Sequence, residues 1–207
     1  DGIPVREPVP PEEVDSSFDG ASTPSDDDDG AETMASRRLL ELQQEAEAFL
    51  AAQAGGAAVA MGPLERDRRA AVIVRRFENY LLDHPEDVPG LILYGKFLRA
   101  IGERERANVF FVAANEIDPQ LAVVKQQIGN YLAEEGEFAL AWAYLRAAVQ
   151  LEPEEAQYHY QLGELLATFR DRFLELELMT PEQLDERMLA AMAAARGLAP
   201  DNLDILA

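Results

Sequence analysis

The stretches YGKFLRAIGERERANVFFVAANEIDP at residues 94–119 and IGNYLAEEGEFALAWAYLRAAVQLEP at residues 128–153 are two versions of one pattern. They lie 34 residues apart, and the same step separates Pro85, Pro119 and Pro153. A fixed period of this length is typical of stacked helical repeats, in which each unit adds one pair of helices to a continuous core. Each proline is expected to close the second helix of its unit, because the residue before a proline is disfavoured in the helical conformation.

A glycine recurs within the first helix of each unit, at positions 95, 129 and 163. Glycine destabilises a helix interior by up to about 1 kcal/mol relative to alanine, so its recurrence calls for a compensating interaction. Close packing of two helices is such an interaction. We therefore expect Gly95 to face Ala107 and Gly129 to face Ala141.

These units resemble the tetratricopeptide repeat, in which a large apolar residue and a small residue on the first helix are followed by two alanines, an intervening aromatic and a closing proline. The residues that carry the resemblance are Tyr94, Gly95, Ala107, Phe111, Ala114 and Pro119, then Ile128, Gly129, Ala141, Leu145, Ala148 and Pro153, and finally Leu162 and Gly163. The family's tryptophan is replaced by Leu91, Lys125 and His159. The resemblance implies an all-α, right-handed α-solenoid of stacked antiparallel helix pairs.

The same period divides the chain into segments. We expect a disordered, acidic and proline-rich tail at residues 1–33 and a divergent helix pair at 34–87, followed by repeats at 88–121, 122–155 and 156–202. Residues 203–207 would begin a further repeat, which suggests that the sequence is a fragment of a longer protein.

Charge and composition narrow the function. The chain has 18 basic and 39 acidic residues, a net charge of −21 and no cysteine. Such a charge repels nucleic acid and anionic lipid, and no stretch is apolar and long enough to insert into a membrane. The run Asp26–Asp29 is either a solvated tail or bait for a basic partner, and it does not fit a calcium loop, which would need ligands where Ser25 and Ser36 stand.

No catalytic, metal or cofactor site is predicted. The two histidines, His84 and His159, stand apart, and His159 replaces the family's packing tryptophan. There is no phosphate-binding glycine loop and no nucleophile elbow.

The third repeat contains 13 additional residues, because its closing Pro200 follows Pro153 by 47. Thr180-Pro181-Glu182-Gln183 predicts a helix start with a capping box. The helix before it is then expected to run over residues 156–179, about 36 Å at 1.5 Å per residue. It would present an apolar stripe of Phe169, Phe173 and Leu176, either as a docking or homo-oligomer surface or packed on a lengthened helix 181–197.

The resemblance also implies a binding surface, because the first helices of such repeats line a concave groove. The candidate partner-binding residues are Lys96, Arg99, Gln126, Asn130, Tyr160 and Glu164. Amide side chains could pair with the backbone of an extended peptide, and Tyr160 could stack on an apolar side chain.

We therefore predict a non-catalytic scaffold that binds an extended or helical segment of a partner protein. Two alternatives stay open at this point: an accessory repeat domain of a larger enzyme, such as a transferase, and a chaperone-like holder of an export substrate.

Overall fold

The computed structural model describes the backbone of residues 26–54 and 62–201, and the side chains of residues 34–53 and 62–201. The tail predicted to be disordered and the start of a further repeat at 203–207 lie outside the residues whose side chains are described. The chain divides into two units, Asp1–Ser36 and Arg37–Ala207, and the second carries the repeats.

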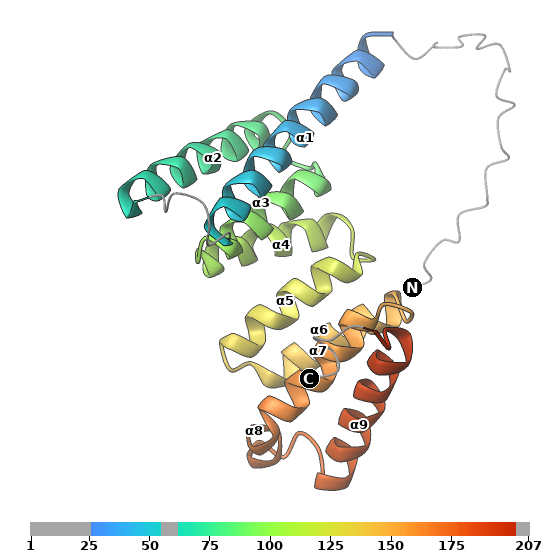
Figure 1. Ribbon diagram of the computed structural model, residues 1–207. Helices are drawn as coiled ribbons and strands as arrows, with labels where there is room; N and C mark the ends of the chain where they lie inside the picture. The colour runs from blue at the N-terminus through green and yellow to red at the C-terminus, as the bar shows by residue number, and fades with distance from the viewer. Residues whose placement is uncertain (1–25, 55–61, 202–207) are drawn as a thin grey trace, which may run out of the picture. The chain divides into compact units, whose positions relative to one another are not determined.

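The described residues are helical and contain no strand (Figure 1). The helices are α1 Asp26–Ala54, α2 Pro63–Asp83, α3 Val88–Ala100, α4 Arg104–Ile117, α5 Ala122–Glu134, α6 Phe138–Leu151, α7 Ala156–Thr168, α8 Arg170–Glu175 and α9 Pro181–Leu198. The all-α prediction is thus confirmed, and α1 begins earlier than the expected start of the first helix pair.

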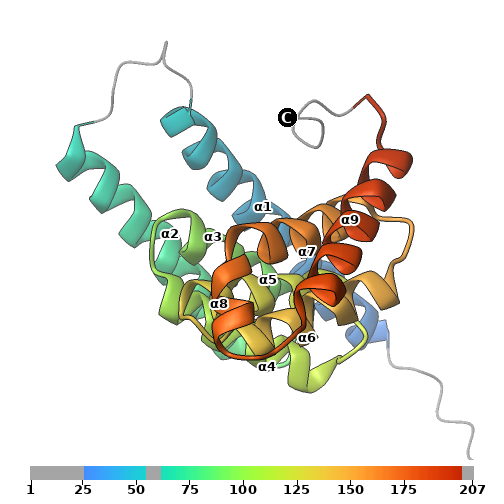
Figure 2. The same cartoon turned by 90° about the horizontal axis from the view of Figure 1, so that it is seen from below.

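The repeats pair helices as the 34-residue period predicts. Helix α3 packs on α4, α5 on α6, and α7 on α9, while α4 contacts α5 and α6 contacts α7 across successive repeats (Figures 1 and 2). The first helices α3, α5 and α7 each contain 13 residues and begin 34 residues apart. Gly102 and Gly136 form the turns that follow α3 and α5, with φ of 93° and 84°, values that glycine adopts without the cost of a Cβ.

The recurring glycines do permit close packing, but against large side chains. A Cβ on Gly95 would lie 2.8 Å from the Phe111 ring, and one on Gly129 would lie 2.8 Å from Leu145 Cγ. The expectation that Ala107 and Ala141 face these glycines is corrected in this respect: both alanines are buried, yet the nearest side chain is the large residue one turn further along the second helix.

The first helix of the third repeat does not continue to residue 179, so that prediction is wrong. Helix α7 ends at Thr168, Phe169 leaves the helical conformation with ψ of 23°, and the chain turns into the short helix α8. The bend places Phe173 in the core, where it is 0% exposed, with its ring centroid 6.1 Å from that of Phe138. Burial of this aromatic side chain stabilises the bent conformation.

The insertion nevertheless lies where the period places it, between the two helices of the third repeat. Gly163 on α7 faces Met192 on α9, and Met192 stands 47 residues after Leu145, the side chain that covers Gly129. The predicted capping box is confirmed: Thr180 accepts a hydrogen bond from the Gln183 backbone and the Gln183 side chain accepts one from the Thr180 backbone. The additional residues form α8 and a turn.

Aromatic side chains join the N-terminal helices to the first repeat. The Phe77 ring on α2 stacks on Tyr94 of α3 at 5.3 Å, and Phe49 on α1 contacts Phe97 of α3 edge-on at 5.8 Å. These contacts make α1 and α2 part of the same core as the repeats.

Tyr94 is expected to make the fold sensitive to high pH. Burial raises the pKa of Tyr94 to about 12, and the adjacent Glu78 carboxylate adds to the rise. Between about pH 10 and pH 12 the unfolded chain loses this proton and the folded chain keeps it, so the free energy of unfolding falls as pH rises, by about 1.4 kcal/mol per pH unit for one such group.

Urea unfolding at pH 9, 10 and 11 would measure this slope. The variant Tyr94→Phe should show a shallower decline than the unsubstituted chain over the same range. An equal decline in both would contradict the assignment to Tyr94.

Candidate functional site

A pocket of about 280 Å³ is formed by side chains from three successive first helices. Of the six predicted groove residues, Arg99 on α3, Asn130 on α5 and Glu164 on α7 line this pocket together. Asn130 and Glu164 occupy equivalent positions in their repeats, so the 34-residue period brings them to the same surface. Glu134 of α5 and Gln161 and Thr168 of α7 complete the polar part of the lining, and its apolar part includes Leu145 of α6 and Leu165 of α7.

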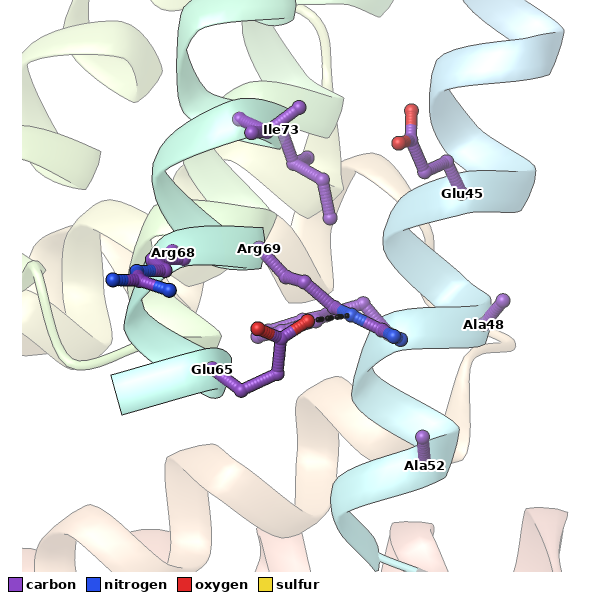
Figure 3. Close-up of a pocket in the computed structure, with 9 residues that line it drawn as sticks. Glu45, Ala48, Ala52, Glu65, Arg68, Arg69 and Ile73 are labelled. Carbon is purple, nitrogen blue, oxygen red and sulfur yellow. Dashed lines mark hydrogen bonds and ion pairs between the residues drawn. The ribbon is translucent and has the colours of Figure 1, made fainter. Parts of the chain in front are cut away.

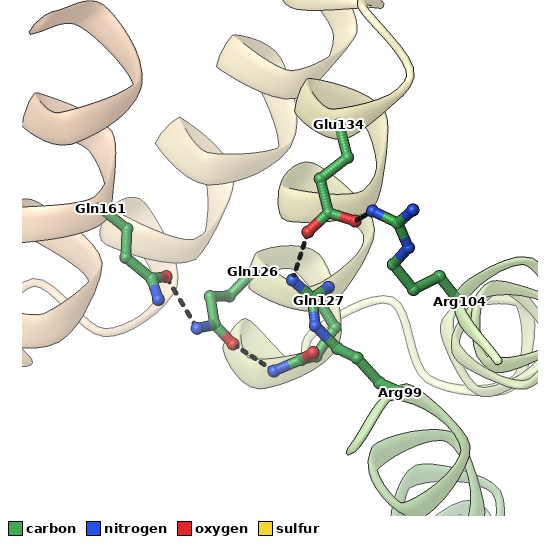
Figure 4. Close-up of polar contacts among 6 residues, drawn as sticks. All are labelled: Arg99, Arg104, Gln126, Gln127, Glu134 and Gln161. Atoms are coloured by element: carbon green, nitrogen blue, oxygen red, sulfur yellow. Dashed lines mark hydrogen bonds and ion pairs between the residues drawn. The ribbon is translucent and has the colours of Figure 1, made fainter. Parts of the chain in front are cut away.

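Gln126 takes part in a chain of amides within the protein (Figure 4). Its Nε2 donates to Gln161 Oε1 at 2.7 Å, and its Oε1 accepts from Gln127 Nε2 at 2.8 Å. Gln126 is 8% exposed, which makes it the one buried polar side chain among the described residues. The Gln126 amide is thus already paired within the protein. Its partner Gln161 lines the pocket, and the sequence analysis did not identify Gln161.

Glu134 at the end of α5 holds two arginines (Figure 4). It accepts from Arg99 Nη2 at 2.9 Å and from Arg104 Nη1 at 3.1 Å, and so links α3 and the start of α4 to α5. The positive charge expected from Arg99 is therefore paired within the groove. This pairing crosses from one repeat to the next, which the spacing within a single repeat does not reveal.

The other two groove candidates lie outside the pocket lining. Lys96 on α3 is exposed, and Tyr160 on α7 is half-buried. Neither belongs to the lining described above.

The predicted docking stripe is not brought together. Phe173 is buried, Phe169 is half-buried against Phe138 at a centroid distance of 4.8 Å, and only Leu176 is well exposed, at 52%. The stripe required an uninterrupted helix, and the bend at Phe169 turns two of its three members inward. The long helix that was expected to carry a homo-oligomer surface is therefore not formed.

No metal-binding cluster is found among residues 34–53 and 62–201. No group of three or more histidines or acidic residues in these ranges could hold a metal ion. His159 Nε2 lies 2.8 Å from the carbonyl oxygen of Pro153, and the His84 ring packs on Tyr80. Among these residues, too, no helix is long and apolar enough to cross a membrane.

Comparison with known proteins gives the fold. No protein-family model matches the chain, and no curated protein does. Among solved structures, one of MamA is 18% identical with a TM-score of 0.55 and covers 67% of this chain and 74% of its own. MamA from Desulfovibrio magneticus RS-1, from residue 41 to its end, is 21% identical with a TM-score of 0.54 over 68% of this chain and 72% of its own.

A third structure carries the repeat in its description. YrrB, described as a TPR protein with an unusual peptide-binding site, is 21% identical with a TM-score of 0.54 and covers 68% of this chain and 66% of its own. At these identities the likeness concerns the fold. The repeats of this chain form a tetratricopeptide-type right-handed α-solenoid, as the sequence pattern predicts.

Proposed function

We propose that this chain is a non-catalytic interaction protein that binds a segment of a partner protein along α3, α5 and α7. The observation that carries the proposal is the shared pocket, in which Arg99, Asn130 and Glu164 from three repeats meet. A surface assembled from the first helices of successive repeats suits an elongated ligand that contacts each repeat in turn. The description of YrrB as a TPR protein with a peptide-binding site supports the same reading.

The charges along the groove suggest in which orientation a ligand would bind. Equivalent positions on α3, α5 and α7 carry Lys96, Asn130 and Glu164, so a cation, an amide and an anion follow one another. Lys96 and Glu164 are exposed, and Asn130 is half-buried between them. A bound segment should place an acidic side chain near Lys96 and a basic one near Glu164, because complementary charges favour one orientation.

A peptide-display selection on the whole chain would test this function. Selected peptides would be synthesised, and their affinities measured by titration calorimetry for the unsubstituted chain, Asn130→Ala and Glu164→Lys. We expect each variant to bind groove peptides about tenfold more weakly, the loss of one charged or buried polar contact.

Glu116→Lys is the matched control, because it makes the same charge reversal at an exposed residue of α4. It should bind the peptides as the unsubstituted chain does. Unchanged affinity in both Asn130→Ala and Glu164→Lys would remove the groove as the binding site.

A further inference from the structure

A second and larger pocket, of about 480 Å³, lies between α1 and α2 (Figure 3). Its floor is apolar and consists of Ala48, Phe49, Ala52, Val72 and Ile73. Phe49 and Ile73 are buried, and Val72 is 55% exposed. In the repeats, the paired helices pack closely at a glycine, whereas α1 and α2 leave this space between them. The space is large enough for a bulky apolar side chain.

An arginine is held at the mouth of this pocket. Arg69 Nε donates to Glu65 Oε1 at 2.9 Å, one turn earlier on α2, and the guanidinium extends into the space between the helices (Figure 3). Within the described part of the chain, no acceptor is assigned to its two terminal nitrogens. A guanidinium fixed through Nε presents its other N–H groups as a fork that matches a carboxylate.

The acidic groups beside the pocket already have cationic partners. Glu65 is paired with Arg69, and Glu45 on α1 accepts from Arg76 of α2. Residues 65–78 hold five arginines and three acidic residues, Glu65, Asp67 and Glu78, and so carry a net charge of +2 in a chain whose net charge is −21. The start of α2, at Pro63, adds the positive end of a helix dipole. The lining itself holds two carboxylates, Glu45 and Glu65, and two guanidinium groups, Arg68 and Arg69. Because both carboxylates are paired with arginines, an anionic ligand would meet the terminal nitrogens of Arg69.

We propose that the pocket between α1 and α2 binds an acidic segment of a partner protein in which a large apolar side chain stands next to an aspartate or glutamate. The apolar side chain fills the floor between Ala48 and Val72, and the carboxylate pairs with the terminal nitrogens of Arg69. The site uses α1 and α2, so it is separate from the groove on α3, α5 and α7 and adds a second binding function.

The same display selection, repeated with Arg69→Gln as counter-selection, tests this site. Peptides that bind the unsubstituted chain and not the variant should be enriched in Asp or Glu adjacent to Leu, Ile, Phe or Trp. Calorimetry should show these peptides binding about tenfold more weakly to Arg69→Gln. Arg75→Gln is the matched control, because it removes an exposed arginine of α2 outside the pocket lining, and it should leave the affinity unchanged.

A second variant probes the apolar floor. Val72→Gln keeps an exposed position but makes it polar, and it should weaken the same peptides while sparing groove peptides. Amide shifts in NMR spectra on peptide addition should fall on residues 45–52 and 65–73.

Several results would overturn this assignment. One is that no selected peptide is sensitive to Arg69→Gln; another is that the sensitive peptides lack acidic residues. If the chain self-associates and Arg69→Gln abolishes that self-association, the occupant of the pocket is a second copy of the chain. Peptides sensitive to Glu164→Lys report on the groove alone, so failure of this site and failure of the groove are distinguishable.

Discussion

Gly129→Val is expected to lower the free energy of unfolding by about 3 kcal/mol. A Cβ at this position would lie 2.8 Å from Leu145 Cγ and 3.2 Å from the Leu145 backbone nitrogen. Leu145 is 1% exposed and belongs to the core, so neither its side chain nor its backbone can move aside without opening the contact between α5 and α6. Overpacking of such a site costs about 1–3 kcal/mol or more. Because valine has a higher helix propensity than glycine, helix propensity alone would raise the free energy of unfolding, and any decrease must come from overpacking.

Urea unfolding followed by circular dichroism would measure the effect, with Gly197→Ala as the matched control. Gly197 lies in α9 with no atom within 4 Å of a built Cβ, so alanine there should raise the free energy of unfolding by about 0.5 kcal/mol. A Gly129→Val variant as stable as the unsubstituted chain would mean that α5 and α6 are not in close contact at this glycine.

The positions of the helices follow from the sequence because the period marks them directly. Pro85, Pro119 and Pro153 precede the starts of α3, α5 and α7 by three residues each. The partner of each glycine was harder to predict. A small residue suggests a small neighbour, yet the atoms nearest to a Cβ on Gly95 belong to Phe111 and not to Ala107. Which side chain covers the glycine depends on how the two helices pack, and the residue types of one repeat do not specify that.

The bend in the third repeat could not be predicted from local pattern alone. Residues 156–179 contain no proline and no glycine after Gly163, so nothing local marks a helix end at Thr168. The break arises from tertiary burial. Fully burying a phenylalanine contributes about 2–3 kcal/mol, which exceeds the net contribution of about 1 kcal/mol from a backbone hydrogen bond lost at the bend.

The candidate sites also differ in how far the sequence predicts them. Register alone places Asn130 and Glu164 on one surface, because equivalent positions of stacked repeats face the same side. The pairing of Arg99 with Glu134 depends on how one repeat stacks on the next. The pocket beside Arg69 lies in the divergent pair, where the repeat pattern offers no template. The dense arginines of residues 66–76 were its only signal in the sequence.

Tyr80 shows how the divergent pair is fitted to the repeats. It stands 34 residues before Ala114 and is 2% exposed, and its ring lies 2.8 Å from a Cβ built on Gly90. The Tyr80 hydroxyl donates to Asp87 Oδ2 at 2.9 Å, and the same oxygen accepts from the Gly90 backbone at 3.0 Å to cap α3. A larger side chain on α2 is thus accommodated by a smaller residue on α3.

Phe173→Ala is expected to lower the free energy of unfolding by about 3–5 kcal/mol, the cost of removing a buried aromatic ring from a core. Phe173 is fully buried in α8, in one cluster with Phe138 and Leu184. Leu176→Ala is the matched control, because Leu176 is 52% exposed at the end of the same short helix and should change stability by less than about 0.5 kcal/mol.

The comparison of Phe173→Ala with Leu176→Ala decides between two structures of the third repeat. If α7 ran straight to residue 179 and its apolar stripe were an exposed docking surface, Phe173 would be open to solvent, and the two alanine variants would unfold at nearly the same urea concentration. In the bent structure Phe173, unlike Leu176, belongs to the core cluster that joins α8 to α6 and α9, so its loss should also expose Phe138. The fluorescence of Trp142, which packs against the same cluster, should report this exposure independently of the unfolding measurement.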